Sequence, residues 1–160
     1  MTSDQILDKI LETAYVKADL LRRIRVIREH LEQKFFAQDK TKKVEISPED
    51  ETLAGEFTKD NTYAYLNAIN ERVKTLPMVN IYVPIDVDAA QSTTVGQWVR
   101  ANVDREALIE FHVELGAFGG CAFAWNGVYY DYSLKHYMHK KMDAIRKVLD
   151  GYTAAIPDQV

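Results

Sequence analysis

Two histidines and an aspartate near the end of the chain have the spacing of metal ligands. His136, His139 and Asp143 stand at positions i, i+3 and i+7, so a helix would place all three on one face. A zinc site also needs a fourth ligand and supporting hydrogen bonds, and Lys140 and Lys141 bring positive charge beside any cation. We expect no metal here, but a small enzyme or metal-binding domain built on this triplet stays open as an alternative.

Cys121 is the only cysteine of the chain. A catalytic thiol needs a nearby base and an electropositive site, whereas Cys121 lies in an apolar run between Gly120 and Ala122. We expect it to be buried and inert. A single cysteine also excludes an intrachain disulfide and a cysteine-based zinc site, which fits a reducing compartment.

The signatures of nucleotide binding and hydrolysis are missing. The chain has no G-x-x-x-x-G-K-[ST] loop, no G-x-G-x-x-G after a strand, no G-x-S-x-G elbow and no H-E-x-x-H pair. The net charge of −4 disfavours nucleic acid, and a cluster of arginines can pair with the acidic segment that follows it. We expect no catalytic residue, no cofactor and no nucleic-acid partner. The arginines are Arg22, Arg23, Arg25 and Arg28, and the acidic residues include Glu45, Glu49, Asp50, Glu51 and Glu56.

The composition is that of a globular chain, because 47% of the 160 residues are hydrophobic and 28% are charged. No run approaches the roughly 20 apolar residues of a membrane-spanning helix. The first residues lack the basic and apolar parts of a secretory signal. We therefore expect no direct membrane insertion, and any membrane association should come through partner proteins.

The elements of the first half, residues 1–76, have the periodicity of helices. Apolar residues at intervals of three and four predict one long helix over residues 4–38, with Thr2 or Ser3 as its N-cap. A lone helix cannot bury such a stripe, so it must pack against another element or another protein. The stripe comprises Leu7, Ile10, Leu11, Ala14, Ala18, Leu21, Ile24, Leu31 and Phe35.

Two shorter helices are predicted in the same half. Ser47 supplies an N-cap and is followed by a proline at the first helical position. Leu53 and Phe57 should face inward from this first short helix. The second is predicted over residues 61–76 and ends before Pro77. Its apolar face carries Leu66, Ile69 and Val73.

After residue 76 the pattern changes from the period of a helix to that of strands, which marks a domain boundary. We predict an α+β protein, in which a helical N-terminal region precedes a small β-α-β-β-α domain with a mixed sheet over residues 77–152. A loose tail over residues 153–160 follows. The predicted elements of the domain are strands over 79–87, 109–115, 121–125 and 128–132 and helices over 88–102 and 134–149.

Several residues of the second half should shape these elements. Pro84 should leave the first strand with an open edge or end it early, and Asn126-Gly127 predicts a tight hairpin. The Gly119-Gly120 pair indicates a bulge or bend. The helix over residues 88–102 should begin with a capping box of Asp88 and Gln91 and bury Val95, Trp98 and Val99. The last helix should be capped by Asp131 or Ser133 and end just before Gly151. Its apolar side should carry Tyr137, Met138, Ile145, Val148 and Leu149.

Aromatic residues are dense between positions 118 and 137. Strand alternation sends some of them to each face of a sheet, so the core can hold only part of the set. The remainder predict an exposed aromatic surface of the kind enriched in protein interfaces. The residues are Phe118, Phe123, Trp125, Tyr129, Tyr130, Tyr132 and Tyr137.

The order of motifs in this region resembles the C-terminal domain of the delta subunit of F-type ATP synthases, which is related to the mitochondrial oligomycin-sensitivity-conferring protein. An apolar residue before a Gly-Gly pair, a strand, a turn with glycine and a D-x-S-[ILV] step into the last helix all have counterparts here. The resemblance covers about residues 74–150, while the first half is shorter than the family's six-helix N-terminal domain. The matching residues are Phe118, Gly119, Gly120, Gly127, Asp131, Ser133 and Leu134.

The resemblance implies a non-catalytic stator subunit of the peripheral stalk. Such a subunit would link the b-subunit stalk to the alpha subunits of the catalytic head, as a peripheral membrane protein at the cytoplasmic face of the cell membrane. We predict Trp125, Tyr129, Tyr132 and Tyr137 for the b contact, with Asp131 and Ser133 as caps and Gly119, Gly120 and Gly127 as residues that shape the backbone.

A different reading is a free-standing interaction adaptor. In that case the long N-terminal helix would form a homotypic coiled coil as an oligomerisation arm, and the β-α-β-β-α domain would bind an unrelated partner. Lys17 and Arg28 interrupt the apolar seam of this helix, which argues against a long homodimer.

Overall fold

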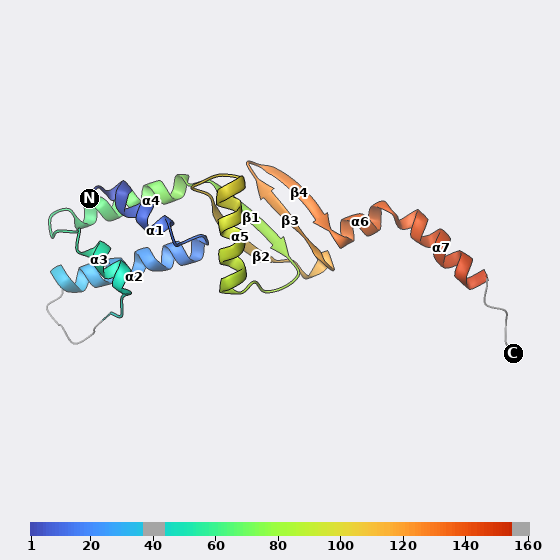
Figure 1. The fold of residues 1–160 in the computed structure, drawn as a ribbon, viewed down its shortest axis with the longest axis horizontal. Helices are drawn as coiled ribbons and strands as arrows, with labels where there is room; N and C mark the ends of the chain where they lie inside the picture. The colour runs from blue at the N-terminus through green and yellow to red at the C-terminus, as the bar shows by residue number, and fades with distance from the viewer. Residues whose placement is uncertain (37–43, 155–160) are drawn as a thin grey trace. The chain divides into compact units, whose positions relative to one another are not determined.

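The structure is a computed structural model that describes residues 1–36 and 44–154 (Figure 1). Over these residues it contains seven α-helices, one short 3-10 helix and a four-stranded mixed sheet, which confirms the predicted α+β class. The chain forms two compact units. The first unit consists of residues 1–79 and 88–110, and the second consists of residues 80–87 and the residues from 111 onward.

The first unit contains the helices of the N-terminal half and one helix from the predicted smaller domain. Their apolar faces form one core, in which Leu7, Leu31, Leu66 and Leu108 are fully or almost fully buried. The helices are α1 (Ser3–Leu11), α2 (Lys17–Phe35), α3 (Pro48–Ala54), α4 (Thr62–Thr75) and α5 (Ala89–Asn102).

The single helix predicted over residues 4–38 is wrong, because α1 ends at Leu11 and α2 begins at Lys17. The segment between them is partly extended: Val16 forms a parallel bridge with Ile109, whose amide donates to the Tyr15 carbonyl at 3.0 Å. The break resets the helical phase, so α2 buries Leu20, Ile24, Ile27 and Leu31 and leaves the predicted stripe residues Ala18 and Leu21 exposed.

Local capping signals were predicted correctly. Thr2 and Gln5 form a capping box at the start of α1, and Ser47 accepts a hydrogen bond from the third residue of α3. Leu53 and Phe57 are buried as expected. The α4 helix also agrees with its predicted range and apolar face.

Helix α5 begins with the predicted capping box of Asp88 and Gln91. Val99 is buried, but Val95 is only half-buried and Trp98 is 62% exposed, so the expected burial of Trp98 is wrong. The buried face of α5 instead carries Gly96 and Val99. These positions are three apart and share a face, whereas Trp98 points elsewhere.

The sheet contains β1 (Met78–Val83), β2 (Leu108–Val113), β3 (Gly120–Trp125) and β4 (Val128–Ser133) in the order β2-β1-β3-β4. Strand β1 ends at Val83 because Pro84 cannot donate to a ladder. Strand β2 ends at Val113, two residues short of its prediction. The pairs β1–β3 and β3–β4 are antiparallel.

Strands β1 and β2 run parallel, as predicted for the β-α-β crossover. The Leu108 amide donates to the Pro77 carbonyl, and the Glu114 amide donates to the Val83 carbonyl. The two bonds span the same sequence separation, since 108 − 77 and 114 − 83 are both 31. An equal offset at both ends is the pattern of parallel strands.

Glycines set the turns on either side of β3. Asn126 and Gly127 have φ of 49° and 76°, the left-handed pair of a two-residue hairpin. Gly120 has φ of 72°, and a Cβ there would lie 2.4 Å from the Tyr132 carbonyl oxygen. The predicted bend at Gly119-Gly120 and the predicted hairpin are thus confirmed.

The predicted last helix is two helices, α6 (Leu134–Lys140) and α7 (Met142–Ala154), separated at Lys141. Ser133 is the N-cap of α6. Gly151 does not end the helix, because α7 continues to Ala154 and takes in the first two residues of the predicted tail. The rest of that tail, residues 155–160, lies outside the described residues.

Candidate protein-docking interface

The two units differ sharply in where their apolar side chains lie. Among the described residues, 23 hydrophobic residues are buried, and all but Ala117 and Ala122 belong to the first unit. The second unit carries 14 of the 20 large hydrophobic residues that are exposed. These are Ile85, Val113, Leu115, Phe118, Val128, Tyr129, Tyr130, Tyr132, Leu134, Tyr137, Met138, Met142, Val148 and Leu149.

The β3–β4 hairpin places an aromatic cluster on one face of the sheet. The Phe123 ring stacks on Tyr130 at 4.9 Å and lies 6.0 Å from Tyr132, centroid to centroid. Trp125 projects to the same face, because its register partner Val128 is two residues from Tyr130. Tyr130 and Tyr132 are 40% and 50% exposed, so this face is accessible to a partner.

Tyr129 lies on the opposite face. It pairs in register with Ala124, and its ring meets Tyr82 edge-on at 5.8 Å. Side chains alternate along a strand, so positions 129 and 132 cannot share a face. Of the four predicted contact residues, the structure therefore places Trp125 and Tyr132 on one face of the hairpin and Tyr129 on the other.

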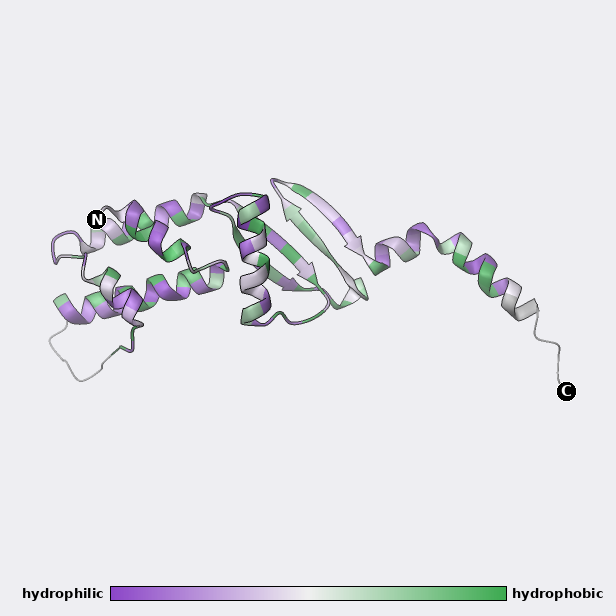
Figure 2. Ribbon diagram, viewed as in Figure 1, coloured by the Kyte–Doolittle hydropathy of each residue, from purple (hydrophilic) through white to green (hydrophobic). Residues whose placement is uncertain are grey.

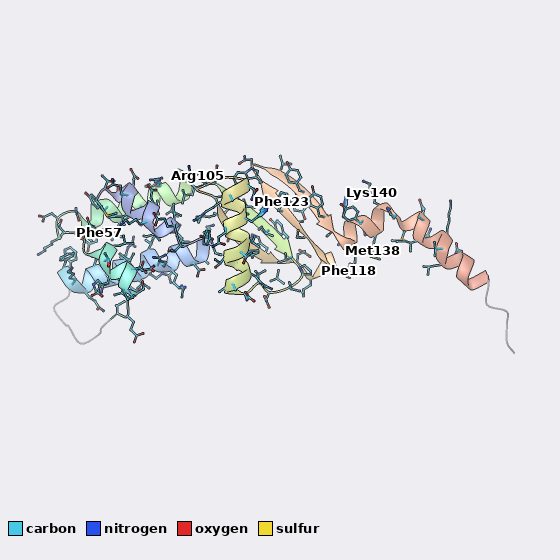
Figure 3. All side chains as sticks on the ribbon, in the orientation of Figure 1. Phe57, Arg105, Phe118, Phe123, Met138 and Lys140 are labelled. Carbon is cyan, nitrogen blue, oxygen red and sulfur yellow. The ribbon has the colours of Figure 1, made fainter. Side chains whose placement is uncertain are left out.

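A second apolar surface runs along α6 and α7, where hydrophobic and hydrophilic residues alternate (Figure 2). We call it the C-terminal stripe, and it consists of Tyr137, Met138, Met142, Ile145 and Val148. Met138, on α6, is marked in Figure 3. Ile145 is half-buried, and the other four are between 38% and 59% exposed. Such faces on a helix are normally covered by another element.

The start of α6 is fixed by the predicted caps. The Ser133 amide donates to Asp131 Oδ1 at 2.9 Å, and Ser133 Oγ accepts from the His136 amide at 3.2 Å. The hydrogen bonds from Ser133 hold the pKa of Asp131 below its ordinary value, with smaller contributions from His136 and Lys135. This junction orients the C-terminal stripe relative to β4.

The structure does not assemble the metal-ligand triplet that the sequence left open as an alternative. In the part of the chain that it describes, no three His, Cys, Asp or Glu side chains are placed to hold a metal ion. The break at Lys141 interrupts the helix face that His136, His139 and Asp143 would need to share. Cys121 is half-buried in β3 rather than buried, which corrects the sequence expectation.

The first unit carries a groove that sequence reasoning missed. Its volume is about 690 Å³, and it lies between α2 and α4. Leu21, Val73 and Met78 supply apolar surface, and polar side chains surround them. The sequence offered no signal for this groove, because Leu21 was predicted to belong to the apolar stripe and its exposure is seen only in the structure. The polar lining residues are Lys17, Asn67, Asn70, Glu71 and Lys74.

A scan against protein-family models gave no match for this chain, and a search of curated proteins gave none either. Within residues 1–36 and 44–154, no helix combines the length and the apolar character needed to cross a membrane.

Proposed function

We propose that this chain is a non-catalytic stator subunit in the peripheral stalk of a rotary F-type ATP synthase. The proposal rests on the apolar surface of the second unit. Among its described residues, 14 large hydrophobic side chains are exposed, and the only hydrophobic residues that are buried are the small Ala117 and Ala122. Large exposed apolar patches in proteins mark interaction sites. A protein whose role is to hold other subunits together needs such surfaces and no catalytic group.

The choice of a stalk protein rests on the resemblance of the second unit. Gly120 and Gly127 have the positive φ that a bend and a tight turn require, and Ser133 caps the helix that follows. These residues belong to the ordered motif that resembles the C-terminal domain of the delta subunit. Their local geometry supports the proposal, because the glycines adopt the positive φ that glycine tolerates best and the serine accepts a hydrogen bond as a helix N-cap.

A stator linker needs two separate attachment surfaces, because it must resist torque between head and stalk. The C-terminal stripe and the sheet face that carries Trp125, Tyr130 and Tyr132, here called the Trp125–Tyr132 face, suit an amphipathic helix of the b subunit. Such a helix would cover their apolar side chains. The groove between α2 and α4 suits a segment of the head's alpha subunits. The complex would keep the chain at the cytoplasmic face of the membrane as a peripheral protein.

The structure does not support the coiled-coil arm on which the alternative adaptor depends. Leu7, Ile10, Ile24 and Leu31, which were to form the coiled-coil seam, are buried in the core of the first unit. A homotypic coiled coil through these residues would require that core to open. The stator proposal makes no such demand.

The test is calorimetric binding of the full chain to the C-terminal part of the b subunit from the same organism. Binding at micromolar affinity or better is expected, and Val148→Asp should weaken it about tenfold or more by placing a charge in the stripe. The matched control is Val103→Asp, which changes an exposed valine of the first unit and should leave the affinity unchanged. Trp125→Ala tests the hairpin face in the same assay. Absence of binding by the full chain would remove the stator role.

A further inference from the structure

A cavity of about 430 Å³ opens on the Tyr82 and Tyr129 face of the second unit. It lies on the side of the sheet opposite the Trp125–Tyr132 face. Its walls combine two tyrosine rings with two carboxylates, and a buried serine and a lysine complete the lining. The side chains concerned are Tyr82, Tyr129, Glu114, Asp131, Ser133 and Lys135.

The aromatic wall is held in place from the neighbouring strand. Tyr82 stacks on His112 at 4.9 Å, and His112 Nε2 lies 3.2 Å from Asn80 Oδ1. Tyr129 meets Tyr82 edge-on, with 65° between the ring planes. Two rings at a steep angle form the corner of a box, and the faces of such rings attract cations.

The electrostatic environment of the cavity is negative. Burial raises the pKa of Tyr129, and the charges of Asp131 and Glu114 raise it further, so both carboxylates act on the same corner. Glu114 Oε1 accepts the Gly116 amide at 3.3 Å. Over the described residues neither Glu114 nor Lys135 takes part in an ion pair. Asp131 accepts the Ser133 amide, and its only basic side-chain contact among these residues is His136 Nδ1 at 3.9 Å.

We propose that this cavity binds an organic cation, that is, a guanidinium or primary ammonium group. The tyrosine faces would attract its charge, and the carboxylates of Glu114 and Asp131 would neutralise it and accept its hydrogen bonds. Lys135 offsets only one of the two negative charges, so an anion is disfavoured. The cation is an arginine or lysine side chain of a partner protein or a free polyamine. The proposal does not depend on which protein lies over the C-terminal stripe.

The probes are acetyl-arginine amide, its neutral isostere acetyl-citrulline amide, and spermidine. Each is titrated into the full chain at low ionic strength, where screening is weakest, and followed by amide NMR shifts. The arginine derivative should give saturable shifts at Ala122, Tyr129 and Asp131, and the citrulline derivative should not. Stronger binding of the arginine derivative assigns the site to a protein side chain, and stronger binding of spermidine assigns it to a polyamine.

Variants locate the site. Tyr129→Leu should weaken binding about two- to fivefold and Glu114→Gln about twofold, and both residues are exposed enough for the fold to survive. The matched controls in the first unit are Tyr63→Leu and Glu51→Gln, which should change nothing. Binding that is absent, equal for the citrulline derivative, or insensitive to Tyr129→Leu would overturn the proposal. Such a result would leave the stalk-binding test unaffected, because that test depends on Val148 and Trp125.

Discussion

Replacing Gly96 by alanine should destabilise the protein, although alanine favours helices. Gly96 lies inside α5, where the change alone would stabilise the helix by about 1 kcal/mol. A Cβ at this position, however, would lie 2.3 Å from Tyr15 Cβ and 2.6 Å from Tyr15 Cγ. Tyr15 Cβ is bonded directly to the backbone, so a change of rotamer cannot move it away.

Tyr15 is also held on its other side. Arg100 lies 4.5 Å above its ring centroid, and the same guanidinium donates to the carbonyls of Leu11, Ala14 and Ala107. The α1–α2 junction must therefore shift if Tyr15 moves. Overpacking of this kind costs about 1–3 kcal/mol. The 2.3 Å approach to Tyr15 Cβ places this substitution in the upper part of that range, at about 2–3 kcal/mol. Subtracting the gain of about 1 kcal/mol in helix propensity leaves an expected net loss of about 1–2 kcal/mol.

Gly151→Ala is the matched control. Gly151 is also within a helix, but no atom of the described residues lies within 4 Å of a Cβ there. The same substitution should therefore be neutral or stabilising by up to about 1 kcal/mol. Both variants are compared by urea unfolding followed by far-UV circular dichroism, which reports on the helices of both units. If Gly96→Ala is as stable as the parent chain, the close approach of Tyr15 and α5 is wrong.

Two further predictions concern charged groups. Asp50 is buried, and its carboxylate lies 2.5 Å from the Arg23 guanidinium. Asp50→Ala should therefore lower the free energy of unfolding in urea by about 3 kcal/mol, because it leaves the half-buried charge of Arg23 without its carboxylate. A loss below about 0.5 kcal/mol would contradict this. The control is Glu49→Ala, which changes the exposed neighbour of Asp50 in the first turn of α3. Because the pKa of Asp131 is lowered in the folded chain, its contribution to stability is present above the unfolded pKa of about 3.9 and is lost as the pH falls through the folded value. Asp131→Asn should flatten this part of the acid dependence of the thermal midpoint, and an unchanged acid dependence would refute the assignment.

Features that depend on neighbouring residues were predictable from the sequence. Ser47 with the following proline, and Asn126 with Gly127, determine their caps and turns through local sterics and hydrogen bonds. The same is true of the Asp88–Gln91 capping box. Each involves residues at most three positions apart, so no knowledge of the rest of the chain is needed.

Features that depend on distant residues were not predictable in this way. The break between α1 and α2 is stabilised by Ile109, which is more than ninety residues from Tyr15. Neither glycine nor proline marks the break, so periodicity alone favoured one helix. Burial of Trp98 was predicted together with that of Val95 and Val99, but the buried face of α5 is the one that carries Gly96 and admits Tyr15.

The division of the candidate contact residues is a different case, since the sequence did contain the signal. Tyr129 and Tyr132 are three positions apart in a strand, and strand alternation alone separates them. The hairpin register adds that Trp125 belongs with Tyr132. What the sequence could not supply is the cavity on the Tyr129 face, because it depends on Tyr82 and Glu114 from other parts of the sheet.

The lack of a core in the second unit links its stability to binding. Strands need a buried hydrophobic face for independent stability, and among the described residues this unit buries only Ala117 and Ala122 as hydrophobic contributors. A partner that binds only the folded form would add about 2.7 kcal/mol when present at a hundred times its dissociation constant. The exposed residues of the C-terminal stripe contribute little to the stability of the free chain, so Val148→Asp should leave that stability unchanged and remove the part that the partner adds. The effect of this substitution on binding can therefore be measured separately from its effect on the stability of the free chain.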